Sequence, residues 1–211
     1  MSKKTLNIKF KYFSFWMILA LTSTIISCSS TDALIVNPDL IREDSITQSG
    51  LDNDAIDEYI ATNSLENVFT TESGVRYVFL KDGNGETPNL NDIVSIDYIG
   101  KFLTEEAFDA SNEQDAIDRD VLVDGRTYSP LRFNLTRDGA ALGGFVAGFQ
   151  EGVNKILLET DNDNKRLMTT GGRGLVLIPS AVGYGTAGTS NGTIPANTVI
   201  AFEIALVSVR P

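Results

Sequence analysis

The chain has 211 residues with 42% hydrophobic and 21% charged residues, which is typical of one globular domain with extra segments. It contains no histidine, which excludes Ser–His and Cys–His nucleophilic catalysis and most zinc sites. The net charge of −11 repels phosphate backbones and so argues against nucleic-acid binding.

The N-terminus has the features of an export signal. Residues 1–27 hold four lysines and no acidic residue, and the apolar stretch 13–21 is too short for a membrane span but typical of a secretory signal peptide. The segment "IISC" resembles a bacterial lipobox, and it ends at Cys28, the only cysteine. We therefore expect a signal peptide at 1–27 and lipid attachment at Cys28. Ser29 stands where enteric sorting rules place aspartate for inner-membrane retention, so by that resemblance the outer membrane is permitted.

A tether and a short helix are expected next. Residues 28–50 are polar with scattered aliphatic side chains, which is typical of a linker. In the segment 51–69, Leu51, Ile56 and Tyr59 are near helical spacing, which predicts a helix that leads into the folded domain. That domain is expected to span 70–211.

From Gly74 onward, the hydrophobic pattern has the period of two that is typical of strands. Strands are predicted within residues 74–86, 92–102, 132–135, 172–179 and 198–209. The segment 148–159 instead spaces Phe149, Val153 and Ile156 along one face of a helix. Several strands with a single helix predict an α+β fold, in which an antiparallel sheet folds over that helix.

Two polar stretches, 112–129 and 160–172, interrupt this pattern and are interpreted as insertions. In the second, Asp161 and Asp163 alternate as in a calcium-binding loop, but the glycine and the closing glutamate of such a loop are missing. We expect a solvated loop there and no metal site.

Six blocks occur in a characteristic order: "VSIDYIGKF", "FDAS", "PLRFNL", "FVAGFQEGV", "GRGLVLIPSAVGYG" and "GTIPANTVIAFEIALV". Over residues 70–210, the chain resembles the FKBP family of peptidyl-prolyl cis–trans isomerases. The resemblance implies a half-barrel sheet wrapped around a short helix, with an apolar pocket between them. It also implies proline-containing polypeptides as substrates and no cofactor. A monomer is expected.

The resemblance also assigns roles within the pocket. It implies catalytic roles for Tyr98, Asp109 and Tyr184, with the Tyr184 hydroxyl reaching the carbonyl next to the proline. The backbone N–H of Val146 would hold the carbonyl beyond the proline. The substrate-binding walls are assigned to Phe108, Leu131, Phe145, Val146, Phe149, Ile194 and Phe202. Phe149 stands where the family usually has tryptophan, and Leu131 where it usually has an aromatic residue.

The chemistry suits a chain without histidine. Rotation about an Xaa–Pro bond meets a barrier of about 18–20 kcal/mol but breaks no bond, so no nucleophile or general base is required. A dry slot with donors for the twisted amide lowers that barrier.

Other interpretations stay open at this point. Phe149, Phe202, Tyr98 and Asp109 also fit purely structural roles in a core, a strand and a turn. The main hypothesis is an envelope isomerase that assists the folding of exported proteins. The alternatives are a non-catalytic FKBP-like binding or chaperone module, favoured by the residues at 149 and 131, and a structural component whose pocket is filled by residues 112–129.

Overall fold

An antiparallel sheet flanked by helices makes up the part of the chain that this computed structural model describes, residues 38–162 and 165–211. The predicted signal peptide, Cys28 and residues 28–37 of the predicted tether lie outside the described residues. Across the sheet, the strands follow one another in the order β1 (Phe69–Thr70), β2 (Arg76–Lys81), β6 (Arg173–Ile178), β7 (Ile200–Arg210), β3 (Ile93–Phe102) and β4 (Ala107–Ala110). A further strand, β5 (Leu131–Asn134), pairs with β3.

The long strand β3 organises the end of the sheet that carries the site. Its one edge pairs with β7 from Ile93 to Phe102, while its other edge pairs with β5 over 93–96 and with β4 over 99–101. The register shifts between Ser95 and Ile96 and again between Gly100 and Lys101. Because such bulges bend and twist a strand, they re-aim the side chains that follow.

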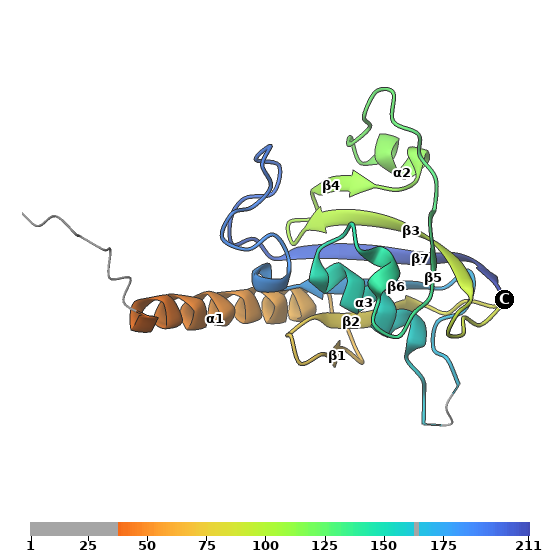
Figure 1. Cartoon of the computed structure of the whole chain (residues 1–211), viewed down its shortest axis with the longest axis horizontal. Helices are drawn as coiled ribbons and strands as arrows, with labels where there is room; N and C mark the ends of the chain where they lie inside the picture. The colour runs from red at the N-terminus through yellow and green to blue at the C-terminus, as the bar shows by residue number, and fades with distance from the viewer. Residues whose placement is uncertain (1–37, 163–164) are drawn as a thin grey trace, which may run out of the picture. The chain divides into compact units, whose positions relative to one another are not determined.

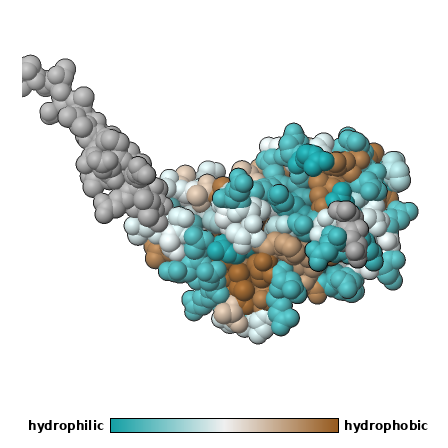
Figure 2. Space-filling model, turned by 90° about the horizontal axis from the view of Figure 1, so that it is seen from below, coloured by the Kyte–Doolittle hydropathy of each residue, from teal (hydrophilic) through white to brown (hydrophobic). Residues whose placement is uncertain are grey.

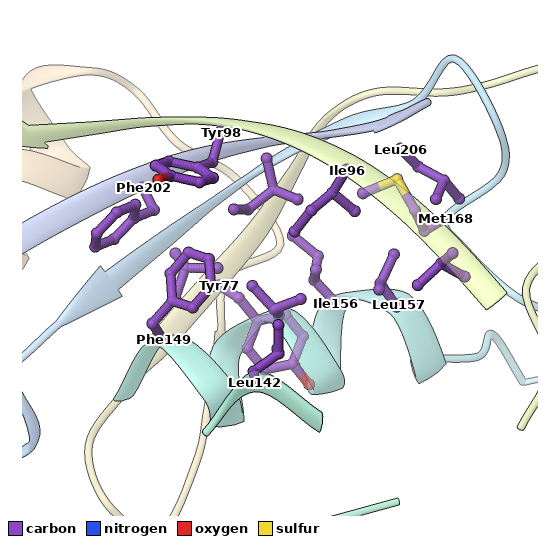
Figure 3. Packing of buried hydrophobic residues seen from close by; sticks show 14 of the residues in the cluster. Tyr77, Ile96, Tyr98, Leu142, Phe149, Ile156, Leu157, Met168, Phe202 and Leu206 are labelled. Carbon is purple, nitrogen blue, oxygen red and sulfur yellow. The ribbon is translucent and has the colours of Figure 1, made fainter. Parts of the chain in front are cut away.

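Helix α3 (Ala147–Leu158) covers one face of the sheet and closes the main core (Figure 3). Two glycines allow it to lie close to β6. A Cβ atom at Gly152 would stand 2.1 Å from Cγ1 of Val176, and one at Gly148 would stand 2.3 Å from Cγ2 of Ile178. Any larger residue at these two positions would therefore push the helix away from the sheet.

Helix α1 (Pro38–Thr62) covers the opposite face, because Leu175 and Leu177 of β6 pack with Ile56 and Tyr59 of this helix while the alternate residues of β6 face α3 (Figure 1). With both faces covered, β6 requires apolar side chains at nearly every position, which explains its continuous hydrophobic run. A buried carboxylate fixes the helix further, since Asp52 accepts hydrogen bonds from the Ser180 N–H at 2.8 Å and from its hydroxyl at 2.7 Å.

The α+β prediction is confirmed. The predicted strand segments contain β2, β3 and β6, and they overlap β5 and β7, each of which extends one residue beyond its predicted segment. Three local expectations differ from the structure. The first helix begins at Pro38 rather than near Leu51, so the second half of the predicted tether is helical. The 112–129 stretch contains a short helix, α2 (Glu113–Asp118), whose first N–H groups bond to the Asn112 side chain. The short strands β1 and β4 were not predicted.

The described residues of the 160–172 stretch, 160–162 and 165–172, form no helix or strand apart from one bridge between Thr160 and Arg166. Two 3₁₀ turns, η1 (Ala140–Leu142) and η2 (Ser180–Val182), precede α3 and the glycine-rich loop respectively. Among the described residues, no helix has both the length and the apolar character that a membrane span needs. On the face in Figure 2, hydrophobic surface forms patches between hydrophilic residues.

Candidate active site

A cavity of about 280 Å³ lies between β4, β7, the start of α3 and the loop 184–194. We call it the aromatic pocket. Six of the residues that were assigned to the site line it, together with one residue from the 112–129 stretch and three polar residues of the loop. The complete lining is Phe108, Asp109, Arg126, Phe145, Tyr184, Thr189, Asn191, Thr193, Ile194 and Phe202.

Phe202 of β7 is the central wall of the pocket. Its ring meets Phe108 edge-to-face at 5.7 Å between centroids and Tyr98 at 5.9 Å, the arrangement that aromatic pairs prefer. Gly100 permits this packing, because a Cβ atom there would stand 2.5 Å from Cε2 of Phe108 and 2.8 Å from Cε1 of Phe202. Because Gly100 has no side chain, the rings of Phe108 and Phe202 can pack closely against β3 at this position.

Phe149 lies beneath the pocket rather than on its surface. The side chain is 0% exposed, and its ring stacks on Phe145 at 4.4 Å between centroids. It meets the ring of Phe202 at 4.7 Å between centroids (Figure 3). Phe145 therefore forms the surface that was assigned to Phe149. Leu131 lines a neighbouring cavity of about 340 Å³, which shares Arg126 and Phe145 with the aromatic pocket. The structure does not bring Leu131 into the aromatic pocket itself.

The carboxylate of Asp109 is held by three donors. Oδ2 accepts a hydrogen bond from the Tyr98 hydroxyl at 2.9 Å, and Oδ1 accepts one from the Ala110 N–H at 2.9 Å. Arg126 donates to Oδ1 at 2.5 Å in an ion pair. Burial, followed by the charge and hydrogen bond of Asp109, raises the pKa of Tyr98 to about 12. Tyr98 thus stays a neutral donor throughout the physiological range.

Arg126 was not predicted to be a site residue, because residues 112–129 were interpreted as an insertion. In the structure, this arginine lines the pocket, pairs with Asp109 and lies over the Tyr128 ring at 4.8 Å from the ring centroid. The hydrogen bond to Asp109 is the main cause that raises the pKa of Arg126. The sequence did offer one indication of this role. Arg126 is one of two arginines in an otherwise acidic stretch, and that stretch ends directly before the block "PLRFNL".

Tyr184 lies at the rim of the pocket on a tightly folded loop. Gly185 has a φ of +60°, a conformation that glycine adopts at little cost. Its N–H bonds to Ser180 at 2.9 Å, and its carbonyl accepts from Asn197 at 2.7 Å. Partial burial, and then the charge of Asp109, raises the pKa of Tyr184. Its hydroxyl donates no hydrogen bond to any described residue, so the donor is available to a ligand.

Val146 is the N-cap of α3, and its side chain packs against the main core without lining the pocket. Its backbone N–H has no acceptor among the described residues. Helix N-termini favour negative partial charge, such as that of a carbonyl oxygen. The N–H of Val146 and the hydroxyl of Tyr184 are therefore two free donors beside an apolar cavity.

Known proteins resemble this chain in sequence and in fold. Residues 84–207 match the family model of the FKBP-type peptidyl-prolyl cis-trans isomerases. The chain therefore belongs to this family. It is 30% identical over 172 residues to the FKBP-type peptidyl-prolyl cis-trans isomerase FkpA of Aeromonas hydrophila, covering 78% of this chain and 52% of that protein.

It is also 26% identical over 177 residues to FkpA of Escherichia coli K12, covering 81% of this chain and 53% of that protein. The chain thus spans about half the length of these relatives. The crystal structure of a peptidyl-prolyl cis-trans isomerase from Pseudomonas syringae shows the same fold, with a TM-score of 0.50 and 20% identity over 79% of this chain and 96% of that one.

Proposed function

We propose that this protein catalyses the cis–trans isomerisation of Xaa–Pro bonds in polypeptides. The observation that carries the proposal is the aromatic pocket, in which the Tyr184 hydroxyl is free while Asp109 is held by Tyr98 and Arg126. Membership of the family supports the same conclusion. The reaction needs no cofactor, because the bond rotates without breaking.

Each part of the site has a role in this reaction. The rings of Phe108, Phe145 and Phe202 would take the proline ring out of water. The Tyr184 hydroxyl would donate to the carbonyl next to the proline, and the Val146 N–H would donate to the carbonyl beyond it. Donors fixed in advance stabilise the twisted amide more than the planar one when they fit its geometry, and this difference lowers the barrier.

A non-catalytic binding module is the second candidate. Phe149 is fully buried behind Phe145, and Leu131 and the Val146 side chain lie outside the aromatic pocket, so three of the assigned walls are missing from its surface. A pocket filled by residues 112–129 is less well supported, because Arg126 contributes only to the lining and a cavity of about 280 Å³ remains.

The Tyr184→Phe variant tests the role of the free hydroxyl. Loss of one neutral hydrogen bond in the transition state is expected to lower kcat/KM by about tenfold in a proline-limited refolding assay. Tyr77→Phe is the matched control, since the Tyr77 hydroxyl donates to Glu159 at the C-terminal end of α3 and Tyr77 does not line the pocket. Equal loss in both variants, or no loss in Tyr184→Phe, would contradict the proposed role.

We also propose that the protein is an exported, monomeric lipoprotein of the cell envelope, where it assists the folding of exported chains. The four lysines of the leader, the apolar stretch 13–21 and the sole cysteine at 28 support this proposal. Ser29 and Ser30 after the cysteine favour the outer membrane over the inner one. Unfolded polypeptides that contain proline would be the partners.

A further inference from the structure

A second cavity, of about 760 Å³, lies beside the aromatic pocket. We call it the α1 groove. Its walls come from three segments: α1, the end of β3 with the turn that follows, and the loop that leads into β7. The apolar residues in its lining are Leu51, Ala55, Phe102, Leu103, Pro195 and Val199. This volume is in the range of about 300–1,000 Å³ in which proteins hold ligands.

The walls of the α1 groove are fixed to one another. The buried carboxylate of Asp52 binds both the N–H and the hydroxyl of Ser180, and Ile56 is 0% exposed in the core under the helix. On the next turn of α1, the Tyr59 hydroxyl donates to Glu105 at 2.6 Å, and Glu105 belongs to the turn that forms the opposite wall. The groove is thus preformed, so a ligand need not order it.

The groove adjoins the aromatic pocket at two places. Thr193 lines both cavities. The Phe102 ring, in the groove, packs against the Phe108 ring, in the pocket, at 5.3 Å between centroids. The groove is therefore within reach of a polypeptide whose proline occupies the pocket.

We propose that the α1 groove binds an extended apolar stretch of the same polypeptide whose proline enters the aromatic pocket. The inference rests on the proposed function and deepens it, since it makes unfolded chains with apolar side chains near the proline the preferred substrates. Leu51 shows why the occupant is apolar: its side chain is 58% exposed on the groove wall, and covering it would remove hydrophobic surface from water. Among the described residues of the lining, Asp52 and Glu106 alone are charged, so an acidic segment would be repelled.

A pair of peptides tests this inference on the whole chain. The short peptide holds only the residues on either side of the proline, and the long one adds three leucines or isoleucines, on the N-terminal side in one version and on the C-terminal side in another. Wild-type protein is expected to act on one long version with a kcat/KM about five- to tenfold higher than on the short peptide. In Leu51→Asp, this ratio should fall toward one.

Leu80→Asp is the matched control, because Leu80 is also an exposed leucine, at 45%, but belongs to β2 and does not line the groove. This variant should keep the wild-type ratio. The groove inference is overturned if wild type treats short and long peptides alike or if Leu51→Asp keeps the ratio. It is also overturned if sedimentation shows that wild type is a dimer and Leu51→Asp a monomer, since a second copy of the chain would then occupy the groove.

The failure of the proposed function has a separate signature, which is no turnover of the short peptide. In that case the same ratio is measured from dissociation constants by fluorescence anisotropy, with the same two variants. A ratio that collapses in Leu51→Asp alone then supports the groove without catalysis. A ratio near one in wild type overturns it.

Discussion

The carboxylate of Asp109 explains much of the chemistry at the scale of single residues. A charge beside an apolar pocket is costly unless it is paired and hydrogen-bonded. Here Tyr98, Arg126 and the Ala110 N–H supply those partners, so the carboxylate is held in one orientation. The result is a charged edge on a pocket that also holds the rings of Phe108, Phe145 and Phe202, which fits a substrate with an apolar ring and a polar amide.

The raised pKa of Tyr98 predicts a pH dependence of stability. In the unfolded chain its phenol titrates near the ordinary value of 10.0, whereas in the folded protein its pKa is about 12. The folded state therefore holds this proton more tightly, and its contribution is fully present below pH 10 and is lost as the pH rises from about 10 to about 12.

Urea denaturation at a series of pH values checks this prediction. Wild type should lose free energy of unfolding across that interval, and Tyr98→Phe should lose less, because it lacks the titrating phenol. The free energy difference between the two proteins should thus narrow above pH 10. Parallel curves for the two proteins would show that the Tyr98 phenol is not the group responsible.

The roles of single residues were only partly predictable from the sequence. Tyr184 drew attention because it lies between two glycines, and it does line the pocket. Arg126 did not, since its importance comes from one contact with Asp109 across 17 positions that no local pattern encodes. Phe149 lies within α3, whereas Phe145 lies just before its N-cap, and only packing decides which of the two stacked rings reaches the pocket.

At the scale of elements, the close approach of α3 to β6 depends on glycine. Alanine is favoured over glycine in a helix by up to about 1 kcal/mol. At Gly152, however, a Cβ atom would stand 2.1 Å from Cγ1 of Val176, a buried side chain with a stiff χ1. Overpacking of this kind costs about 1–3 kcal/mol, so the clash outweighs the gain in helix propensity.

We therefore expect Gly152→Ala to lower the free energy of unfolding by about 1–2 kcal/mol in chemical denaturation. Gly144→Ala is the matched control, because a Cβ atom at Gly144 would have no neighbour within 4 Å. Its effect should be within about 0.5 kcal/mol of zero, as for most surface substitutions. A stabilised Gly152→Ala protein would mean that α3 can move away from the sheet at little cost.

The predictable elements were those with strong periodicity. β3 and β7 alternate clearly over ten residues or more, and α3 presents a continuous apolar face. β1 and β4 are only two and four residues long, and their pairing partners, rather than their own side chains, define them. The first half of α1 has no apolar face that would reveal a helix. The contact of Asp52 with Ser180, which holds α1 against the sheet, comes from the second half of the helix.

At the scale of the whole molecule, charge separates residues 1–27 from the rest of the chain. Residues 1–27 are basic, whereas the remaining residues include all 28 acidic residues of the sequence, a distribution that suits the proposed export. The helix that begins at Pro38 lies ten positions after Cys28. A lipid on Cys28 would thus be joined to the folded domain through a short segment and α1.

Lipidation predicts a change in fractionation. Wild-type protein grown with a labelled fatty acid should carry the label and sediment with membranes, whereas Cys28→Ser should lose both properties because the chain has no other cysteine. Ser29→Ala is the control and should stay labelled. Membrane association without label, or label that persists in Cys28→Ser, would contradict a lipid anchor at this position.

The most direct test of the central claim is exchange spectroscopy by NMR on an Xaa–Pro peptide, with residues 29–211 at micromolar concentration. Uncatalysed isomerisation takes tens to hundreds of seconds and so gives no exchange cross-peaks at mixing times of about one second. We predict that the protein produces cross-peaks between the cis and trans signals, and that Tyr184→Phe weakens them. Binding of the peptide without exchange cross-peaks would contradict catalysis and leave a binding module in its place.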